Sequence, residues 1–205
     1  MEKTRKTRIS VLSLILLAIA AAALIIGLAA AKYVKEVRMT HTIKVSADLA
    51  KSIEIFEHKA NRTEHGDYET EKTEVTKNDY VLMPGVDVPK DPTVRIKEYT
   101  GLAAWLYVEI VETTVPDTVT YATASGWTQL TGLTGPNGGK IYYRELTNAQ
   151  TGDLEFPVLA NNTVTVSESI PRDTTLKLDF YAYITQQKGT AADDFASFTA
   201  NTTNP

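Results

Sequence analysis

The chain has no cysteine, and only 3 histidines and 2 tryptophans among its 205 residues. Without cysteine it cannot form a disulfide framework or a thiolate metal site, and it has no thiol nucleophile or cysteine-linked lipid anchor. It also has no Gly-x-Ser-x-Gly elbow and no phosphate loop ending in Gly-Lys-Ser/Thr. We therefore expect no enzymatic activity, no catalytic residues, no bound metal and no cofactor.

The chain also has no excess of positive charge. After residue 31 the chain carries 17 basic and 24 acidic side chains, a net charge of −7. Such a surface repels the phosphate backbone. We expect no nucleic-acid partner.

The sequence has one long hydrophobic run, Ser10 to Ala31, of 22 residues. At about 1.5 Å per residue, a helix of this length can cross a bilayer core of about 30 Å. Four basic residues precede it, namely Lys3, Arg5, Lys6 and Arg8. This arrangement is typical of a signal peptide or a signal anchor, with residues 32–205 outside the cell or on its surface.

Three alanines end the run just before Lys32, as at a signal-peptidase cleavage site. We expect cleavage after Ala31. The alternative is a retained anchor, because the apolar run is long and because Lys32, Lys35 and Arg38 flank its far side.

The exported part, residues 32–205, has the composition of one β domain. It holds 27 of the 29 threonines, and threonine favours strands. Period-2 alternation predicts strands, and the most buried of them is expected at residues 103–114. One further strand is expected to start near His41. The others are expected at residues 93–99, 127–130, 140–147, 154–160, 163–167 and 176–185. Eight or nine strands with short connections predict an all-β, two-sheet antiparallel sandwich, jelly-roll-like, with a short helix within residues 190–198.

Three finer expectations follow from local patterns. Residues 154–160 and 163–167 are expected to pair with each other. In residues 176–185 one face is apolar, and the other, which includes Tyr183 and Thr185, is expected to face water. Acidic pairs such as Glu109 with Glu112 are expected on solvated faces, and the charged segment 58–79 is expected to be a loop or an irregular hairpin.

A proline-rich stretch between Tyr80 and Thr93 predicts an ordered extended turn rather than a central strand. The residues singled out in it are Pro84, Gly85, Asp87, Pro89, Asp91 and Pro92. The two aspartates could hold a calcium ion on a rigid turn. The favoured interpretation is that they form Asx-turn hydrogen bonds to backbone amides that the prolines leave without strand partners.

The histidines offer the strongest test of a metalloenzyme. Glu57-His58 and Glu64-His65 recur seven residues apart, but neither forms the His-Glu-x-x-His motif of a zinc protease. A structural or adventitious metal site built on His58 and His65 is the minor alternative to a solvated charged loop.

Several segments resemble a known family. They are the long export signal, residues 42–58 (Thr-Ile-Lys-Val-Ser-Ala-Asp onward), residues 78–93 (Asn-Asp-Tyr-Val-Leu-Met-Pro-Gly-Val-Asp-Val-Pro-Lys-Asp-Pro-Thr) and residues 104–110 (Ala-Trp-Leu-Tyr-Val-Glu-Ile). Together they resemble exported Gram-positive proteins related to the TasA and camelysin (CalY) biofilm-fibre family, whose signals are typically processed by the SipW signal peptidase. The resemblance implies a jelly-roll subunit that polymerises into extracellular matrix fibres.

The resemblance also implies an assembly mechanism, in which the mature N-terminal segment donates a strand to the neighbouring subunit. Mapped onto this chain, the donor is residues 32–43, with Val34, Val37, Met39 and Ile43 as the inserted apolar residues. The partners implied are further copies of the chain, a signal peptidase during export, and other matrix or cell-surface components. The sequence departs from the family around Lys32, so the resemblance does not fix the cleavage site.

Two other functions remain open from the sequence. One is a membrane-anchored cell-surface module that keeps its hydrophobic helix and binds carbohydrate or protein through its loops. The other is a peptidase, since camelysin-type relatives are described as casein-cleaving metalloproteins, although the ligand spacing for zinc is missing.

Overall fold

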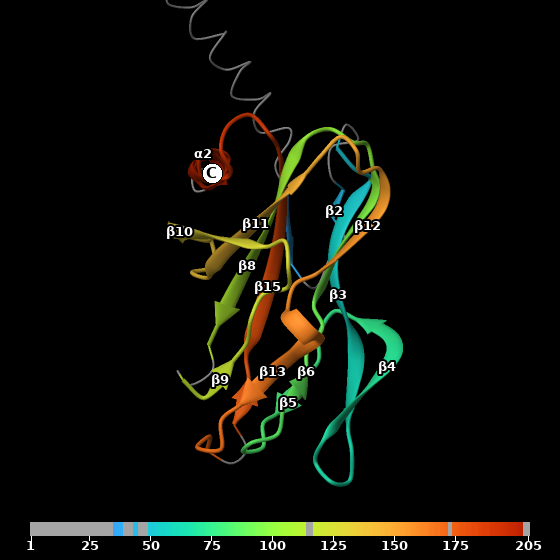
Figure 1. Ribbon diagram of the computed structural model, residues 1–205, viewed down its shortest axis with the longest axis vertical. Coiled ribbons are helices and arrows are strands. Elements are labelled where there is room, and N and C mark those ends of the chain that lie inside the picture. Colours follow the sequence, from blue (N-terminus) through green and yellow to red (C-terminus); the bar gives the residue numbers. More distant parts are fainter. Residues whose placement is uncertain (1–34, 39–42, 45–48, 114–116, 172–173, 203–205) are drawn as a thin grey trace, which may run out of the picture. The chain divides into compact units, whose positions relative to one another are not determined.

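The computed structural model describes residues 35–38, 43–44, 49–113, 117–171 and 174–202. Within these ranges the chain is built of antiparallel strands, one α-helix and one short 3-10 helix (Figure 1). The predicted all-β class is confirmed. None of the helices in these ranges has the length and apolarity needed to cross a membrane, and the hydrophobic run Ser10 to Ala31 lies outside them.

The first main sheet has five strands in the order β1-β15-β8-β11-β10. Its strands are β1 (Lys35–Arg38), β15 (Leu178–Gln186), β8 (Ala104–Glu112), β11 (Lys140–Leu146) and β10 (Thr128–Thr134). β8 pairs with β15 along one side and with β11 along the other. The prediction that this segment is a buried central strand is confirmed.

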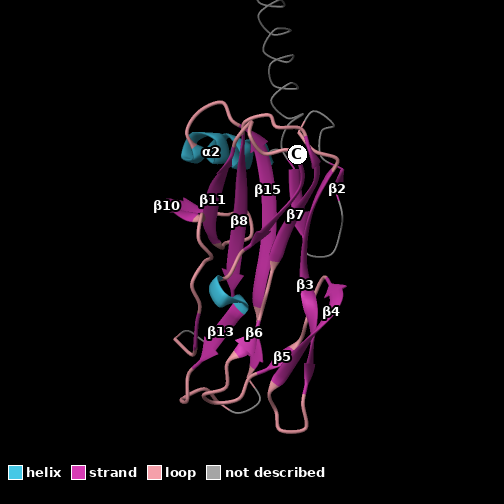
Figure 2. Ribbon diagram, turned by 45° about the vertical axis from the view of Figure 1, so that its right-hand side comes forward, coloured by secondary structure: helices cyan, strands magenta, loops and turns pink. Residues whose placement is uncertain are grey.

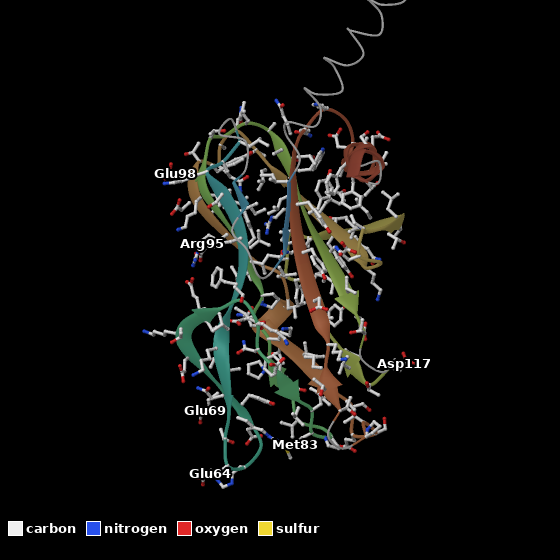
Figure 3. All side chains as sticks on the ribbon, turned by 180° about the vertical axis from the view of Figure 1, so that it is seen from behind. Glu64, Glu69, Met83, Arg95, Glu98 and Asp117 are labelled. Atoms are coloured by element: carbon white, nitrogen blue, oxygen red, sulfur yellow. The ribbon has the colours of Figure 1, made fainter. Side chains whose placement is uncertain are left out.

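The second main sheet has the order β12-β7-β3-β2, and β4 also pairs with β3. Its strands are β12 (Gly152–Pro157), β7 (Thr93–Tyr99), β3 (Ser52–Arg62), β2 (Ile43–Lys44) and β4 (Tyr68–Val75). The charged segment 58–79 is thus mostly a hairpin with an irregular register, and Glu64 lies at its tip (Figure 3).

Short strands complete the fold. β13 (Thr163–Val166) joins β6 (Val88–Pro89) to β9 (Val119–Thr120), and β14 (Thr175–Leu176) pairs with β5 (Tyr80–Val81). The proposed pairing of residues 154–160 with 163–167 is wrong, because β12 pairs with β7 and β13 pairs with β6 and β9. The 3-10 turn η1 (Ala160–Asn162) separates them, and positive φ angles of 55° at Asn161 and 53° at Asn162 redirect the chain there.

The main core lies between the two sheets. Leu106 and Val108 of the first sheet and Ile53 and Val94 of the second belong to the same cluster, each 0% exposed. This arrangement is that of a β-sandwich.

A second, smaller core lies on the other face of the first sheet. Helix α2 (Ala191–Thr202) lies beside the first sheet (Figure 2). Its Phe195 and Phe198 cover this core and pack on Tyr107 and Tyr183. The predicted terminal helix is confirmed and runs longer than expected. The water-facing side predicted for residues 176–185 is confirmed at Lys177 and Asp179, which are exposed, and is wrong at Tyr183 and Thr185, which are 0% and 4% exposed.

Glu109 is a charged residue inside this sheet. Its side chain is 0% exposed and accepts hydrogen bonds from the Tyr183 hydroxyl (2.5 Å), the Gly139 amide (2.8 Å), and the backbone and side-chain nitrogens of Asn137 (2.9 and 3.0 Å). A Cβ atom on Gly135 or Gly139 would come within 3 Å of Glu109, so glycine is required at both positions. The expectation of a solvated carboxylate is wrong, because Glu109 organises the turn between β10 and β11.

Arg95 ties the strands of the second sheet together on its outer face (Figure 3). Its guanidinium binds Glu54 of β3 (3.2 Å), Glu74 of β4 (2.6 Å) and Glu155 of β12 (2.5 Å). It also stacks 4.0 Å from the ring centre of Phe56. One bidentate cation thus connects four strands, including its own.

Replacing Glu109 by leucine should lower the free energy of unfolding by about 3 kcal/mol, because several buried donors lose their acceptor. The matched control is Glu112→Leu, which changes an exposed glutamate on the same strand. It should alter stability by less than about 0.5 kcal/mol. Urea denaturation measures both, and equal effects would contradict the role given to Glu109.

Stability should also depend on the ionisation of Glu74. Hydrogen bonding to Arg95 lowers the pKa of this carboxyl. A carboxyl with a lowered folded-state pKa stabilises the fold above its unfolded pKa, about 4.3, and loses that contribution as the pH falls through the folded value.

Glu74→Gln should therefore flatten the loss of stability below about pH 4.3, by less than about 1 kcal/mol because the pair is partly exposed. Urea denaturation as a function of pH measures this effect. The control is Glu69→Gln, on the same strand but outside the Arg95 cluster. A wild-type pH dependence in the Glu74 variant would refute the assignment.

Candidate functional site

The N-terminal segment contributes an edge strand to each main sheet. β1 pairs with β15, with Lys35 opposite Ile184 and Arg38 opposite Tyr181, and β2 pairs with β3, with Ile43 opposite Ile53. The predicted donor, residues 32–43, is therefore divided between two sheets rather than forming one strand. Of its four apolar residues, Val37 lies in β1 and Ile43 in β2, whereas Val34 and Met39 lie outside the described residues.

The single chain fills this edge of its own sheet. Val37 is the register partner of Ala182, and Ala182 and Ile184 are 0% exposed members of the main core. This differs from the expectation of a sheet left one strand short when the chain is alone. The segment that the sequence assigns to a neighbour can thus pair within its own subunit.

The attachment of β1 is limited in extent. It spans four residues and pairs with only the middle of the nine-residue β15, from Tyr181 to Ile184. β2 spans two residues. Since an edge strand forms hydrogen bonds with a neighbour on one side only, few ladder hydrogen bonds hold the described residues 35–38 and 43–44 in place.

The proline-rich turn begins with a regular β-turn. The amide of Val86 donates to the carbonyl of Met83 at 3.1 Å, with Pro84 and Gly85 at the two central positions. Gly85 has a φ angle of 71°. Proline followed by a residue with positive φ is the signature of a type II turn. The predicted ordered turn is confirmed here.

The same stretch ends in a cluster of buried charges. Lys90 and Glu57 form an ion pair with nitrogen–oxygen distances of 3.1 and 3.2 Å, and their side chains are 4% and 0% exposed. The rings of Tyr80 and Phe180 lie 5.3 and 5.4 Å from the Lys90 nitrogen. The sequence reasoning missed this pair, although Glu57 follows Ile53 and Ile55 on the inward face of β3.

Asp91 and Asp87 lie in different surroundings. Asp91 is buried and accepts a hydrogen bond from the backbone amide of His58 at 2.9 Å, while its other oxygen lies 2.5 Å from His58 Nδ1. The Asx turn preferred for Asp91 is therefore wrong, because the backbone amide that its carboxylate binds belongs to His58 of the distant strand β3. Asp87 is exposed and lines a pocket of about 520 Å³ with residues of β9, η1 and β13.

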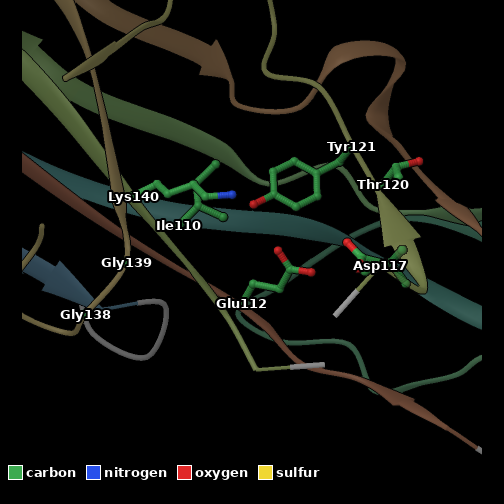
Figure 4. A pocket seen from close by; sticks show the side chains of 9 residues that line it. Ile110, Glu112, Asp117, Thr120, Tyr121, Gly138, Gly139 and Lys140 are labelled. Carbon is green, nitrogen blue, oxygen red and sulfur yellow. The ribbon is translucent and has the colours of Figure 1, made fainter. Parts of the chain in front are cut away.

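A second pocket, of about 500 Å³, lies beside the β10–β11 turn and includes Glu112, Asp117, Tyr121 and Lys140 (Figure 4). Burial raises the pKa of the Tyr121 phenol. Its hydroxyl is buried without a hydrogen-bond partner among the described residues. The sequence did not single out any of these residues as a site.

The two histidines that the structure describes, His58 and His65, lie in different surroundings. His58 pairs with Asp91, and His65 is exposed near the tip of the β3–β4 hairpin. Within the ranges that the structure describes, no group of three or more His, Asp or Glu side chains is arranged to hold a metal ion.

Comparisons with protein-family models, curated proteins and solved structures find no match to the chain.

Asp91→Ala should destabilise the fold by about 2 kcal/mol, because a buried amide and an imidazole lose their acceptor. Asp87→Ala, the matched control in the same turn, should change stability by less than about 0.5 kcal/mol. Thermal and urea unfolding measure both. A rise in Tm with calcium that both substitutions abolish would instead support a calcium site.

Proposed function

We propose that the chain is the exported structural subunit of an extracellular matrix fibre and that it self-assembles by donor-strand addition. In this proposal the domain is a jelly-roll-like sandwich that follows a signal peptide, and it acts by backbone pairing and apolar burial rather than by catalysis. The donor lies in residues 32–43 of each subunit.

One observation carries the proposal. Among the described residues that follow the hydrophobic run, the first two strands are short edge strands, four residues in β1 and two in β2. In a neighbouring copy the same segment would meet the same acceptors, β15 and β3, and would form the same backbone hydrogen bonds. Exchange of an identical element between copies therefore replaces one set of bonds with an equal one.

The acceptor edge has to be refilled once its own segment has left it. A chain that donates its segment leaves backbone groups of Tyr181–Ile184 unpaired, beside buried side chains such as Ala182 and Ile184. An incoming strand satisfies those groups and covers the apolar positions at once. Each subunit then has one donor and one acceptor, so the contact is head-to-tail and extends as a filament if it does not close into a ring.

Export also fits the composition. The basic N-terminus and the apolar run Ser10 to Ala31 direct residues 32–205 across a membrane, and a chain without cysteine needs no oxidative folding. In the proposal a signal peptidase frees the donor, and further copies of the chain are the main partners.

Single-cysteine variants test the exchange, because the chain has no cysteine of its own. Arg38 and Tyr181 are register partners, and partner Cα atoms about 5 Å apart suit a disulfide. Mixed fibres of Arg38→Cys and Tyr181→Cys chains should form disulfide-linked heterodimers on oxidation, seen by non-reducing electrophoresis. The control mixes Arg38→Cys with Thr128→Cys, on the opposite edge strand β10, and should give few dimers.

Locking both cysteines within one chain before assembly gives the converse result. The oxidised Arg38→Cys/Tyr181→Cys chain should remain monomeric by electron microscopy and light scattering, and reduction should restore fibres. A chain that lacks residues 32–43 should also stay monomeric. Fibres of undiminished yield from the locked chain would reject the donor assignment.

A further inference from the structure

The ion pair between Lys90 and Glu57 places a buried amine against a buried carboxyl group. The Lys90 nitrogen lies 3.2 Å from one oxygen of Glu57 and 3.1 Å from the other, so it contacts both oxygens of the carboxylate. Both side chains are almost fully buried, at 4% and 0% exposure. Among the other ion pairs of the described residues, none has both side chains this buried.

We propose that Lys90 and Glu57 condense into an intramolecular amide crosslink after the chain folds. The bond that forms joins Nζ of Lys90 to Cδ of Glu57, and the bond that breaks joins Cδ to one carboxylate oxygen. That oxygen leaves as water and takes two protons from the ammonium group, while the third proton stays on the amide nitrogen. An ammonium and a carboxylate become a neutral amide and water, so no oxidant or other reactant is needed.

The surroundings favour this reaction over a permanent ion pair. Two opposite charges held among the rings of Tyr80 and Phe180 carry a desolvation cost, which the neutral amide removes. The fold also holds the two groups in contact, which gives them a high effective concentration. Burial then keeps water away from the product.

One hydrogen-bond donor is placed to stabilise the developing oxyanion. The backbone amide of Asn78 donates to one oxygen of Glu57 at 3.3 Å. The hydroxyl of Tyr80 lies 3.5 Å from the other oxygen but donates its proton to the carbonyl of Pro89 at 2.7 Å. One carboxylate oxygen therefore has a backbone donor in addition to the lysine, as an oxyanion requires.

The position of the crosslink gives it a structural use. It joins β3 to the end of the proline-rich turn, beside the ladder in which Phe56 pairs with Thr93 of β7. It closes a loop that contains the β4 hairpin. In a chain without cysteine, such an amide would give an exported domain the covalent staple that disulfides give to others. This inference stands whether or not the chain forms fibres.

Mass spectrometry of the folded full-length or mature wild-type chain tests the crosslink. The expected mass is lower than that of the sequence by one water molecule. Tryptic digestion should yield one branched peptide that contains both Glu57 and Lys90, because an acylated lysine is not cleaved. A wild-type chain of full sequence mass, with residues 57 and 90 in separate peptides, overturns the proposal.

Three controls separate the crosslink from adventitious dehydration. Lys90→Arg keeps the charge but lacks the amine nucleophile, and Glu57→Gln/Lys90→Met replaces the pair with neutral side chains of similar size; both should retain the full mass. In the wild-type digest, the exposed pair Lys51–Glu98 and the buried acid Glu109 should remain unmodified. Loss of water that persists in the Lys90 variants would place the dehydration elsewhere and refute the assignment.

If neither variant folds, the wild-type mass and branched peptide still decide the question. Denaturing electrophoresis adds an independent reading, since a chain with an internal loop migrates faster than a linear chain. Identical mobility of the wild-type chain and the Lys90→Arg chain would contradict the crosslink.

Discussion

Backbone pairing at the edges of the two main sheets is the constraint on which the rest of the structure depends. A β-sandwich exposes unpaired amides and carbonyls wherever a sheet ends, and each end must be covered, charged or paired. Here residues 35–38 supply the last strand beside β15, and residues 43–44 supply a short strand beside β3. These two short strands each complete an edge of one main sheet. In the proposed assembly the same edges are completed by strands of the next subunit.

The remaining polar groups inside the domain serve to position loops. Glu109 accepts hydrogen bonds from backbone amides of the β10–β11 turn. Two pairs attach the proline-rich turn to β3, namely Lys90 with Glu57 and Asp91 with His58. A buried charge is tolerated only when hydrogen bonds or an opposite charge satisfy it. Such clusters therefore select one arrangement of the loops. Burial lets the Glu57–Lys90 ion pair fix the position of the proline-rich turn. The same burial makes the pair a candidate for an amide crosslink.

Much of the fold was predictable because many strands carry their burial pattern locally. The strand predicted where the proline-rich stretch ends has the bounds of β7, Thr93–Tyr99, and the pattern of residues 103–114 identified β8 as the central strand. The pairing of β12 with β7 was not predictable, since partners distant in sequence are chosen by the packing of the whole sandwich. The second face of β15 was misjudged because its cover, Phe195 and Phe198 of α2, comes from a different part of the chain.

The candidate site was predictable in its location but not in its geometry. The proline-rich turn was expected to be ordered, yet the burial of Lys90 depends on Glu57, a residue 33 positions away. The donor segment was expected as one strand, whereas the structure divides it between two sheets.

The most direct test of strand exchange is solid-state NMR of fibres assembled from equal amounts of ¹³C-labelled and ¹⁵N-labelled chains. Exchange predicts ¹⁵N–¹³C contacts between residues 35–38 of one chain and residues 181–184 of another. The account would be contradicted if the mixed fibres lacked these contacts while fibres of chains that carry both labels showed them.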